Sequence, residues 1–321
     1  MSENYEWLDP REHVLKRSDT YVGSISVTEM QGHVFIEEDD KIVCKNVKTN
    51  ASPALFKLFD EVISNAIDNS KRDTSQKYIK CALTEEGVFS VSNDGQTIPI
   101  KFWENTDRYI PEILVYELMS GENFKDERIN SSGRNGLGVK IVNLLSDFFE
   151  IHIINVEYGL SYYQRFEKNA SIVKKPIIKK LKATDKRSST TITFKPEYAR
   201  LQMSLPLDKN VVNLIKTRAY DASACTSPSV SVYFNDMKKK LQLNTMKDYT
   251  LALGGSWIGR EEIKDRNGNT NFEFSISAVR KNLDEHPKCV AFVNAIQCSQ
   301  GTHVEMVYRR LIEAMTEICK K

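Results

Sequence analysis

The chain has 321 residues, of which 40% are hydrophobic and 27% charged, and its formal net charge is +2. This length is sufficient for one large domain and a smaller one, each with its own core. The balanced charge excludes a surface that is basic overall, so any contact with DNA must be local.

The six cysteines form no C-x-x-C pair and have no histidines at zinc-ligand spacing, which argues against a structural zinc site. They are typical of buried thiols in a reducing compartment. The amino terminus lacks the charged and apolar segments of a signal peptide, and no stretch approaches the roughly 20 apolar residues that span a bilayer. We therefore expect a soluble, intracellular protein that does not enter a membrane.

The first half of the chain begins with turn signals and short β-branched runs such as Ile42 to Val47, which predict an arm and a small hairpin. From Pro53 to about Asn69, apolar residues recur at helical spacing behind a proline, which predicts a helix. Residues 78–83 and 88–92 then alternate as paired strands do.

Further elements follow in the middle of the chain. Residues 111–119 predict a helix, and a second one from Val139 to about Phe149 opens out of a glycine-rich turn. Short alternating segments predict an antiparallel sheet: 149–154, 161–166, 177–181 and 190–194. Because strands and helices do not alternate strictly, the fold class is α+β rather than doubly wound.

A polar stretch at 243–247 predicts a boundary between domains 1–244 and 245–321. The second domain would contain strands near 272–279 and 290–296 and a closing helix at 304–319.

The helix predicted at 53–69 carries a polar stripe opposite its apolar face. A turn of about 100° per residue groups four side chains there: Glu61, Asn65, Asp68 and Asn69. Glu61 could lie beside a hydrolytic water, and the amide oxygen of Asn65 could bind magnesium, which prefers oxygen ligands. An ordinary solvated face is the alternative explanation.

Two other segments could bind a nucleotide. Asn93-Asp94-Gly95 ends a strand, so it is either a hairpin turn or a pocket floor where the Asn93 amide accepts from the exocyclic amine of adenine. Gly133 to Lys140 opens a helix and could surround phosphates with backbone amides, although a mobile surface loop is the alternative. It matches neither a Walker A loop nor a Rossmann fingerprint.

Three remaining features have ordinary structural explanations. The strand Thr190 to Phe194 needs no ligand, and Gly301-Thr302-His303 suits a helix cap. The lysine-rich stretch from Lys174 to Lys182 is typical of a solvated face, with DNA contact as the minority alternative.

Taken in order, these motifs resemble the ATPase region of type IIA DNA topoisomerases, in the eukaryotic and viral branch of that family. The resemblance covers nearly the entire chain and is carried by seven segments: 8–24, 59–69, 91–100, 133–140, 190–194, 218–223 and 292–304. Each segment is weak evidence alone, but their common order and spacing are specific.

The resemblance implies a Bergerat-type ATP fold, shared with gyrase B, MutL and heat-shock chaperones, followed from about residue 245 by part of a transducer domain with a βαβ-like unit. Glu61 would be the general base, Asn65 would bind Mg²⁺, and Asn93 would contact adenine. The residues implied to bind ATP and its metal are Asn65, Asp68, Arg72, Asn93, Gly121, Glu122, Asn123, Gly133, Arg134, Asn135, Gly136, Leu137, Gly138, Val139, Lys140 and Thr190.

The resemblance also implies a role. Binding of ATP would bring two copies together through the amino-terminal arm and trap a DNA duplex for passage through a cleaved one, in the nucleus or, for a viral protein, in the host cytoplasm or viral factory. The remaining hypotheses are a chaperone or mismatch-repair ATPase with the same fold, and a non-enzymatic interaction module with a decayed nucleotide site.

Three departures from the family pattern change these expectations. Gly121-Glu122 stands where relatives have paired serines, which affects the ribose contacts, and Thr97 replaces a glycine and should stiffen or redirect its turn. The sequence ends at Lys321, before the family's lysine for the γ-phosphate and before any DNA-cleaving region. We therefore expect nucleotide binding with weak or missing turnover, and no DNA cleavage.

Overall fold

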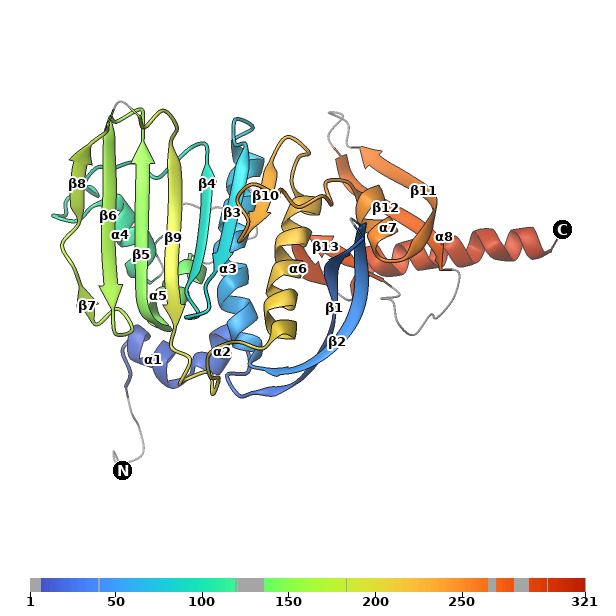
Figure 1. Ribbon diagram of the computed structural model, residues 1–321, viewed down its shortest axis with the longest axis horizontal. Coiled ribbons are helices and arrows are strands. Elements are labelled where there is room, and N and C mark those ends of the chain that lie inside the picture. The colour runs from blue at the N-terminus through green and yellow to red at the C-terminus, as the bar shows by residue number, and fades with distance from the viewer. Residues whose placement is uncertain are drawn as a thin grey trace.

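The computed structural model describes residues 7–39, 41–118, 120, 136–182, 184–264, 270–279, 289–298 and 300–320. A large sheet with helices behind it forms one end of the molecule, and α8 (Thr302–Cys319) projects from the other end (Figure 1). The helices and strands between them combine in the α+β manner that the sequence predicts.

The large sheet has eight strands in the order β10-β3-β4-β9-β5-β6-β7, with β8 also paired to β6. Only β10 and β3 run parallel; the other pairs are antiparallel. The strands are β3 (Tyr78–Leu83), β4 (Phe89–Asp94), β5 (Ser146–Asn155), β6 (Leu160–Glu167), β7 (Ile172–Val173), β8 (Ile177–Lys180), β9 (Ser189–Pro196) and β10 (Ser231–Phe234). Strand β9 lies between β4 and β5 and so joins the two halves of the sheet.

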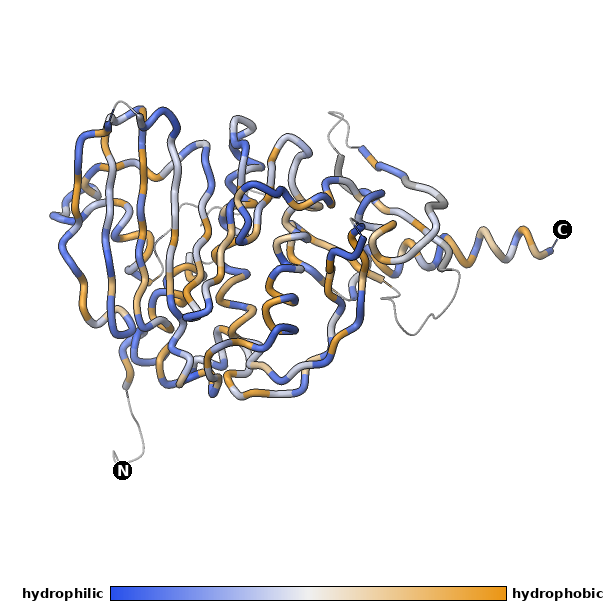
Figure 2. Tube along the Cα trace, viewed as in Figure 1, coloured by the Kyte–Doolittle hydropathy of each residue, from blue (hydrophilic) through white to orange (hydrophobic). Residues whose placement is uncertain are grey.

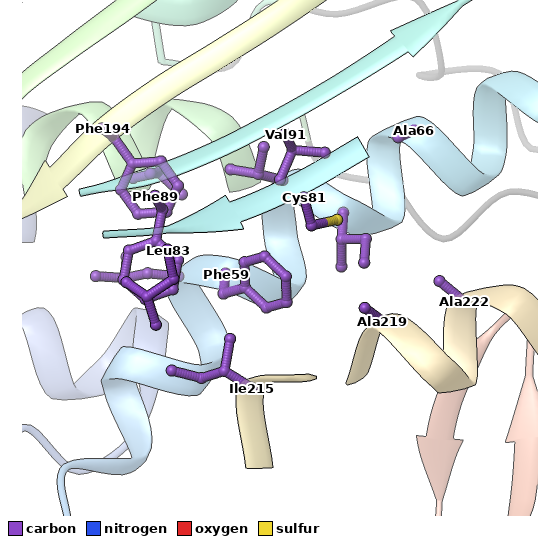
Figure 3. Close-up of a cluster of buried hydrophobic side chains, with 14 of the residues drawn as sticks. Phe59, Ala66, Cys81, Leu83, Phe89, Val91, Phe194, Ile215, Ala219 and Ala222 are labelled. Carbon is purple, nitrogen blue, oxygen red and sulfur yellow. The ribbon is translucent and has the colours of Figure 1, made fainter. Parts of the chain in front are cut away.

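Helix α3 (Pro53–Arg72) is the predicted central helix, extended by one turn at its carboxyl end. Its apolar side packs on the sheet and on α6 (Lys209–Cys225). Phe59 lies between Phe89 of the sheet, at 5.5 Å between ring centroids, and Ile215 of α6 (Figure 3). Phe89 in turn stacks on Phe194 at 5.2 Å. Burial of these large side chains fixes the position of α3 against the strands.

The amino-terminal part is more ordered than the sequence predicts. The arm contains α1 (Pro10–Lys16) and α2 (Ser18–Val22), which were not predicted. The signal for α1 was present, because Asp9 Oδ1 accepts from the backbone N–H of Arg11 at 2.8 Å and Pro10 occupies the first turn. The hairpin of β1 (Thr28–Glu38) and β2 (Lys41–Ala51) is long, with eleven residues in each strand, and curves beside α6 (Figure 1).

The middle of the chain corrects one predicted boundary. Helix α4 (Ile110–Tyr116) lies where it was expected, but α5 (Gly138–Leu144) ends at Leu144 rather than near Phe149. Strand β5 begins at Ser146 because this segment pairs with both β6 and β9. Phe149, Ile151 and Ile153 are buried at every second position, so strand pairing overrides the helical spacing of the apolar residues before them.

After Leu243 the chain forms a smaller group of elements: α7 (Met246–Ala252), β11 (Gly255–Lys264), β12 (Thr270–Val279), β13 (Ala291–Val293), β14 (Ile296–Cys298) and α8. The described strands here pair only as two antiparallel hairpins, so the expected βαβ-like unit is not found among them. Apolar residues recur along α8 (Figure 2) and several are exposed: Met306, Tyr308, Ile312, Met315 and Ile318.

The cysteines differ from expectation, because only Cys44 and Cys81 are buried, while Cys289 and Cys319 are exposed; all six are free thiols. Among the helices that the structure describes, none combines the length and apolar composition that crossing a bilayer requires.

Candidate functional site

A cavity of about 330 Å³ lies between α3 and the sheet. Sixteen residues line it: Val62, Asn65, Ala66, Asn69, Arg72, Asn93, Gln96, Thr97, Ile98, Pro99, Leu114, Val115, Val139, Ile151, Thr190 and Ile192. Five of these were expected from the sequence as nucleotide-binding residues: Asn65, Arg72, Asn93, Val139 and Thr190. The cavity walls are largely apolar with a few amides, as is typical of a site for an organic ligand.

Helix α3 supplies one wall of the cavity through residues three and four positions apart. Asn65 is exposed toward the cavity, and none of its side-chain atoms takes part in a hydrogen bond among the described residues. Its amide is therefore available to a ligand. Asp68, which the sequence grouped with Asn65, is buried and does not line the cavity.

Asn93 lies at the end of β4, and its amide is oriented by two neighbours. Its Nδ2 donates to the backbone carbonyl of Asp94 at 3.1 Å and to Gln76 Oε1 at 3.5 Å. The same Gln76 oxygen accepts from Asn69 Nδ2 at 2.8 Å, and Gln76 itself is fully buried. With the Asn93 amine engaged, its carbonyl oxygen is the group left to accept a hydrogen bond from a ligand.

Gln76 and Asn69 were not among the residues expected to bind the nucleotide. Asn69 belonged to the polar stripe on the helix and could have been found from its spacing. Gln76 carried no such signal, because its role depends on contacts to two elements that meet only in the folded chain.

Asp94 ties the end of β4 to neighbouring segments rather than lining the cavity. Its Oδ1 accepts from the backbone N–H groups of Lys77 and Tyr78, each at 2.8 Å, and its Oδ2 pairs with Arg187 at 2.6 Å. Gly95 follows with φ 95°, and a Cβ there would lie 2.6 Å from Asp73 Oδ2. This backbone conformation and the close approach together require glycine.

Thr97 and Thr190 lie on the other side of the cavity. Thr97 occupies the position where the family pattern has glycine, and its Oγ1 accepts from Asn155 Nδ2 at 2.9 Å, which joins the turn to the end of β5. Thr190 pairs with Asn93 in the β4–β9 register, so the two residues face the cavity from adjacent strands.

Glu61 does not line the cavity, but it lies one helical turn before Asn65, which does. Its carboxylate forms an ion pair with Lys57 one turn earlier on α3. It also lies against the α-carbon of Gly138, where an added Cβ would overlap Glu61 Oε2. The folded chain therefore brings the expected base directly to the glycine-rich segment, with Val139 of that segment inside the cavity.

Lys140 has a position that the sequence did not predict. Its side chain is buried, and its Nζ donates to the backbone carbonyls of Ser120 and Gly136. Burial lowers the pKa of Lys140 to about 8, while the charge of Glu117 acts in the opposite direction. In this structure the ammonium group thus holds two stretches of backbone rather than pointing into the cavity.

The remaining expected residues divide into two groups. Gly136, Leu137 and Gly138 are described, with Gly136 at φ 57°. Gly121, Glu122, Asn123, Gly133, Arg134 and Asn135 lie outside the described residues.

The donors at this site suit magnesium bound together with phosphates. In the described part of the chain, no group of three or more His, Cys, Asp or Glu side chains could hold a metal ion by itself. Magnesium instead commonly takes one or two protein oxygens together with phosphate oxygens and water. The unengaged amide of Asn65 fits that mode.

The sequence of this chain is similar to those of known ATPases and topoisomerases. Residues 50–200 match the family of histidine kinase-, DNA gyrase B-, and HSP90-like ATPases. DNA topoisomerase 2 of Candida albicans is 33% identical over all of this chain, and that of Acanthamoeba polyphaga mimivirus is 31% identical. The chain spans 22% and 25% of the length of these two relatives.

Two solved structures of topoisomerase II regions also match this chain. The ATPase region of Saccharomyces cerevisiae topoisomerase II matches 100% of this chain, with 82% of that chain covered, at 33% identity and a TM-score of 0.85. The ATPase and transducer domains of DNA topoisomerase II from Balamuthia mandrillaris match 77% of this chain, with 63% of that chain covered, at 33% identity and a TM-score of 0.70. The fold is thus that of a gyrase B- and HSP90-like ATPase. Within that class, the chain belongs to the ATPase region of the type IIA DNA topoisomerases.

Proposed function

We propose that this chain binds ATP and magnesium in the cavity beside α3, and that it serves as the ATP-operated gate of a longer type IIA DNA topoisomerase. The observation that supports this best is one arrangement of three groups. The Asn93 amide lies on the floor of the cavity and Asn65 lies on its helical wall. Glu61, one turn before Asn65, meets Gly138, which precedes Val139 of the cavity wall.

The adenine ring would lie on the apolar floor of the cavity between Ile98, Pro99 and Ile192. The Asn93 carbonyl would accept from the exocyclic amine, which is a donor in adenine and is replaced by an acceptor in guanine. Because Gln76 and the Asp94 carbonyl already engage the Asn93 amine, the amide would not need to reorient when the base binds.

The phosphates would extend along α3 toward Gly138. Magnesium, held by Asn65, would neutralise phosphate charge and hold the phosphate chain in one geometry. Glu61 would accept a proton from the attacking water while the oxygen of that water bonds to the γ-phosphorus. The bond from the γ-phosphorus to the β–γ bridging oxygen would break, and ADP would leave. The Lys57 ammonium forms an ion pair with the Glu61 carboxylate that would accept this proton.

In the longer protein, ATP binding would bring two copies together through the amino-terminal arm and trap a DNA duplex. Residues 1–244 would form the ATP-binding domain and residues 245–321 part of the transducer domain. The relatives' topoisomerase 2 names support DNA as the substrate. With DNA as its substrate, the protein would act in the nucleus or, for a viral protein, in the host cytoplasm or viral factory.

Isothermal titration of this chain with a non-hydrolysable ATP analogue and magnesium tests the proposal. We expect saturable binding of one nucleotide per chain, weakened when Asn65 is replaced by alanine and when magnesium is omitted. Absence of binding heat at every temperature tried would instead identify a decayed site and a non-enzymatic module.

A further inference from the structure

A buried cation connects the helix that carries Glu61 with the elements after Leu243. Arg218 lies on α6, and its side chain is only 13% exposed. Its Nε pairs with Asp60 Oδ1 of α3 at 2.6 Å, and its Nη2 donates to Ser64 Oγ at 3.2 Å. The same Nη2 donates to the backbone carbonyl of Ala295 at 3.0 Å, so one guanidinium group contacts both parts of the molecule.

The contact on α3 lies next to the proposed base. Asp60 immediately precedes Glu61, and Lys57 pairs with both carboxylates, at 3.8 Å from Asp60 Oδ2 and in closer contact with Glu61. A displacement of Asp60 by Arg218 would therefore change the position of Lys57 and Glu61. The side chains form one continuous set of charged contacts along a single turn of helix.

The contact after Leu243 is a tight turn between β13 and β14. Asn294 and Ala295 both have positive φ angles, 52° and 66°, and Ala295 is buried. Positive φ at both positions is normal for a two-residue hairpin turn, and Asn294 suits the first position. The second position favours glycine, so alanine there benefits from surrounding contacts. The hydrogen bond from Arg218 to the Ala295 carbonyl supplies one such contact from another part of the chain.

Arg218 is suited to this position by its shape. A planar fork can donate in several directions at once, which the single ammonium of lysine cannot do at the same distances. Among the described residues, its Nη1 is buried and has no hydrogen-bond partner. One donor is therefore available to make a new contact if the β13–β14 turn moves relative to α3.

A second contact joins α6 to the elements after Leu243 without touching α3. Tyr249 of α7 donates its hydroxyl hydrogen to Asp221 Oδ1 of α6 at 2.8 Å, in the interior. It provides a comparison for Arg218, because Tyr249 holds α6 to the later elements without a hydrogen bond to α3, although the Asp221 carboxylate lies in the field of Arg218 and Asp60.

We propose that Arg218 is a positioning residue that couples nucleotide occupancy beside Glu61 to the β13–β14 turn. The inference rests on the proposed ATP site and names its regulation. When nucleotide binding orders α3 around Asp60, the guanidinium transmits the change to residues 291–298, and movement of that turn alters the placement of Glu61 in return, as reciprocal coupling requires.

Hydrogen–deuterium exchange of the whole chain, with and without a non-hydrolysable ATP analogue and magnesium, tests the coupling. Wild type should gain protection at 57–65 and at 291–298 on binding. Arg218→Lys should bind the analogue as wild type does and keep the gain in protection at 57–65. At 291–298, the slowing of amide exchange on binding should be smaller than in wild type by about fivefold or more. Tyr249→Phe should retain both responses.

Steady-state kinetics of the longest active form of the protein adds a second measurement. If Arg218 positions Glu61, Arg218→Lys should lower kcat with KM unchanged, whereas a merely structural role for Arg218 would not change kcat selectively. Should Arg218→Lys fail to fold, Asp60→Ala removes the acceptor of the same link on α3 and must show the same loss at 291–298.

The outcomes separate the two proposals. Binding by wild type, with an unchanged response at 291–298 in either Arg218→Lys or Asp60→Ala, would overturn the coupling and leave the ATP site intact. A wild-type response confined to 57–65 would also overturn it. Absence of nucleotide binding by wild type would overturn the proposed function and this inference together.

Discussion

The carboxylate of Glu61 and the α-carbon of Gly138 are in direct contact, and no room remains between them for a side chain. Glu61 belongs to the long central helix, and Gly138 begins the helix after the glycine-rich segment. The contact unites the expected base with the expected phosphate-binding loop, and it yields the first prediction.

Replacing Gly138 with alanine should displace Glu61 from its pair with Lys57. Overpacking of this kind costs about 1–3 kcal/mol of folding stability. Thermal unfolding should show this loss, and ATP turnover by the longest active form of the protein should fall as well. Gly259→Ala is the control, because a Cβ at Gly259 meets no atom within 4 Å.

A double variant tests whether the loss comes from the clash between a Cβ at position 138 and the Glu61 carboxylate. Removing the carboxylate in a Gly138→Ala, Glu61→Ala double variant should restore most of the lost stability, since contacting residues behave non-additively. Equal losses in the single and double variants would contradict it.

Glu61→Gln should remove the general base while keeping the size of the side chain. We expect nucleotide binding close to that of wild type and turnover reduced by about 10²–10⁴-fold. Turnover is measured in the longest active form of the protein, and binding by titration with a non-hydrolysable analogue. Normal turnover in the variant would exclude Glu61 as the base.

Asn93→Ala should weaken ATP binding about tenfold, because one buried hydrogen bond to the base is lost. The preference for ATP over GTP should fall as well, since the lost acceptor reads the exocyclic amine. Titration with both nucleotides measures this preference. Ser92→Ala is the matched control on the opposite face of β4, where Ser92 Oγ accepts from Thr191 at 2.8 Å; an equal effect there would contradict the assignment.

Lys140 predicts a dependence of stability on pH. Its pKa in the folded chain is lowered to about 8 by burial, from an ordinary value of 10.5. Between these values the unfolded chain holds more protons, so raising the pH favours the folded state. This contribution to stability is therefore lost as the pH falls through about 8.

Denaturant unfolding of wild type and Lys140→Met between pH 7.5 and 10 isolates this contribution. The difference in free energy of unfolding, wild type minus variant, should rise with pH across that range. A flat or falling difference would show that the ammonium is not destabilised by burial.

The sequence predicted much of the fold because strong local patterns mark its main elements. The apolar spacing of α3 and the alternation of β3, β4 and β9 each reflect a face buried against the rest of the chain. The predicted boundary between α5 and β5 was wrong. The strand there forms because it pairs with β6 and β9, and local spacing does not encode that pairing.

The site was predicted less completely than the fold. Helical spacing grouped Asn65 with Asp68, but the packing of α3 turns Asn65 toward the cavity and buries Asp68 away from it. Lys140 was expected at the phosphates and instead binds two backbone carbonyls. Gln76, which orients Asn93, had no sequence signal at all.

The sequence alone determined the family resemblance, the α+β class and the polar stripe on the central helix, because residue spacing fixes the direction of side chains within one element. Only the tertiary structure decided which of those side chains meet: Glu61 with Gly138, and Arg218 with Asp60 and the Ala295 carbonyl. Such contacts join residues far apart in the chain, and their geometry is set by how separate elements pack, which no local pattern specifies.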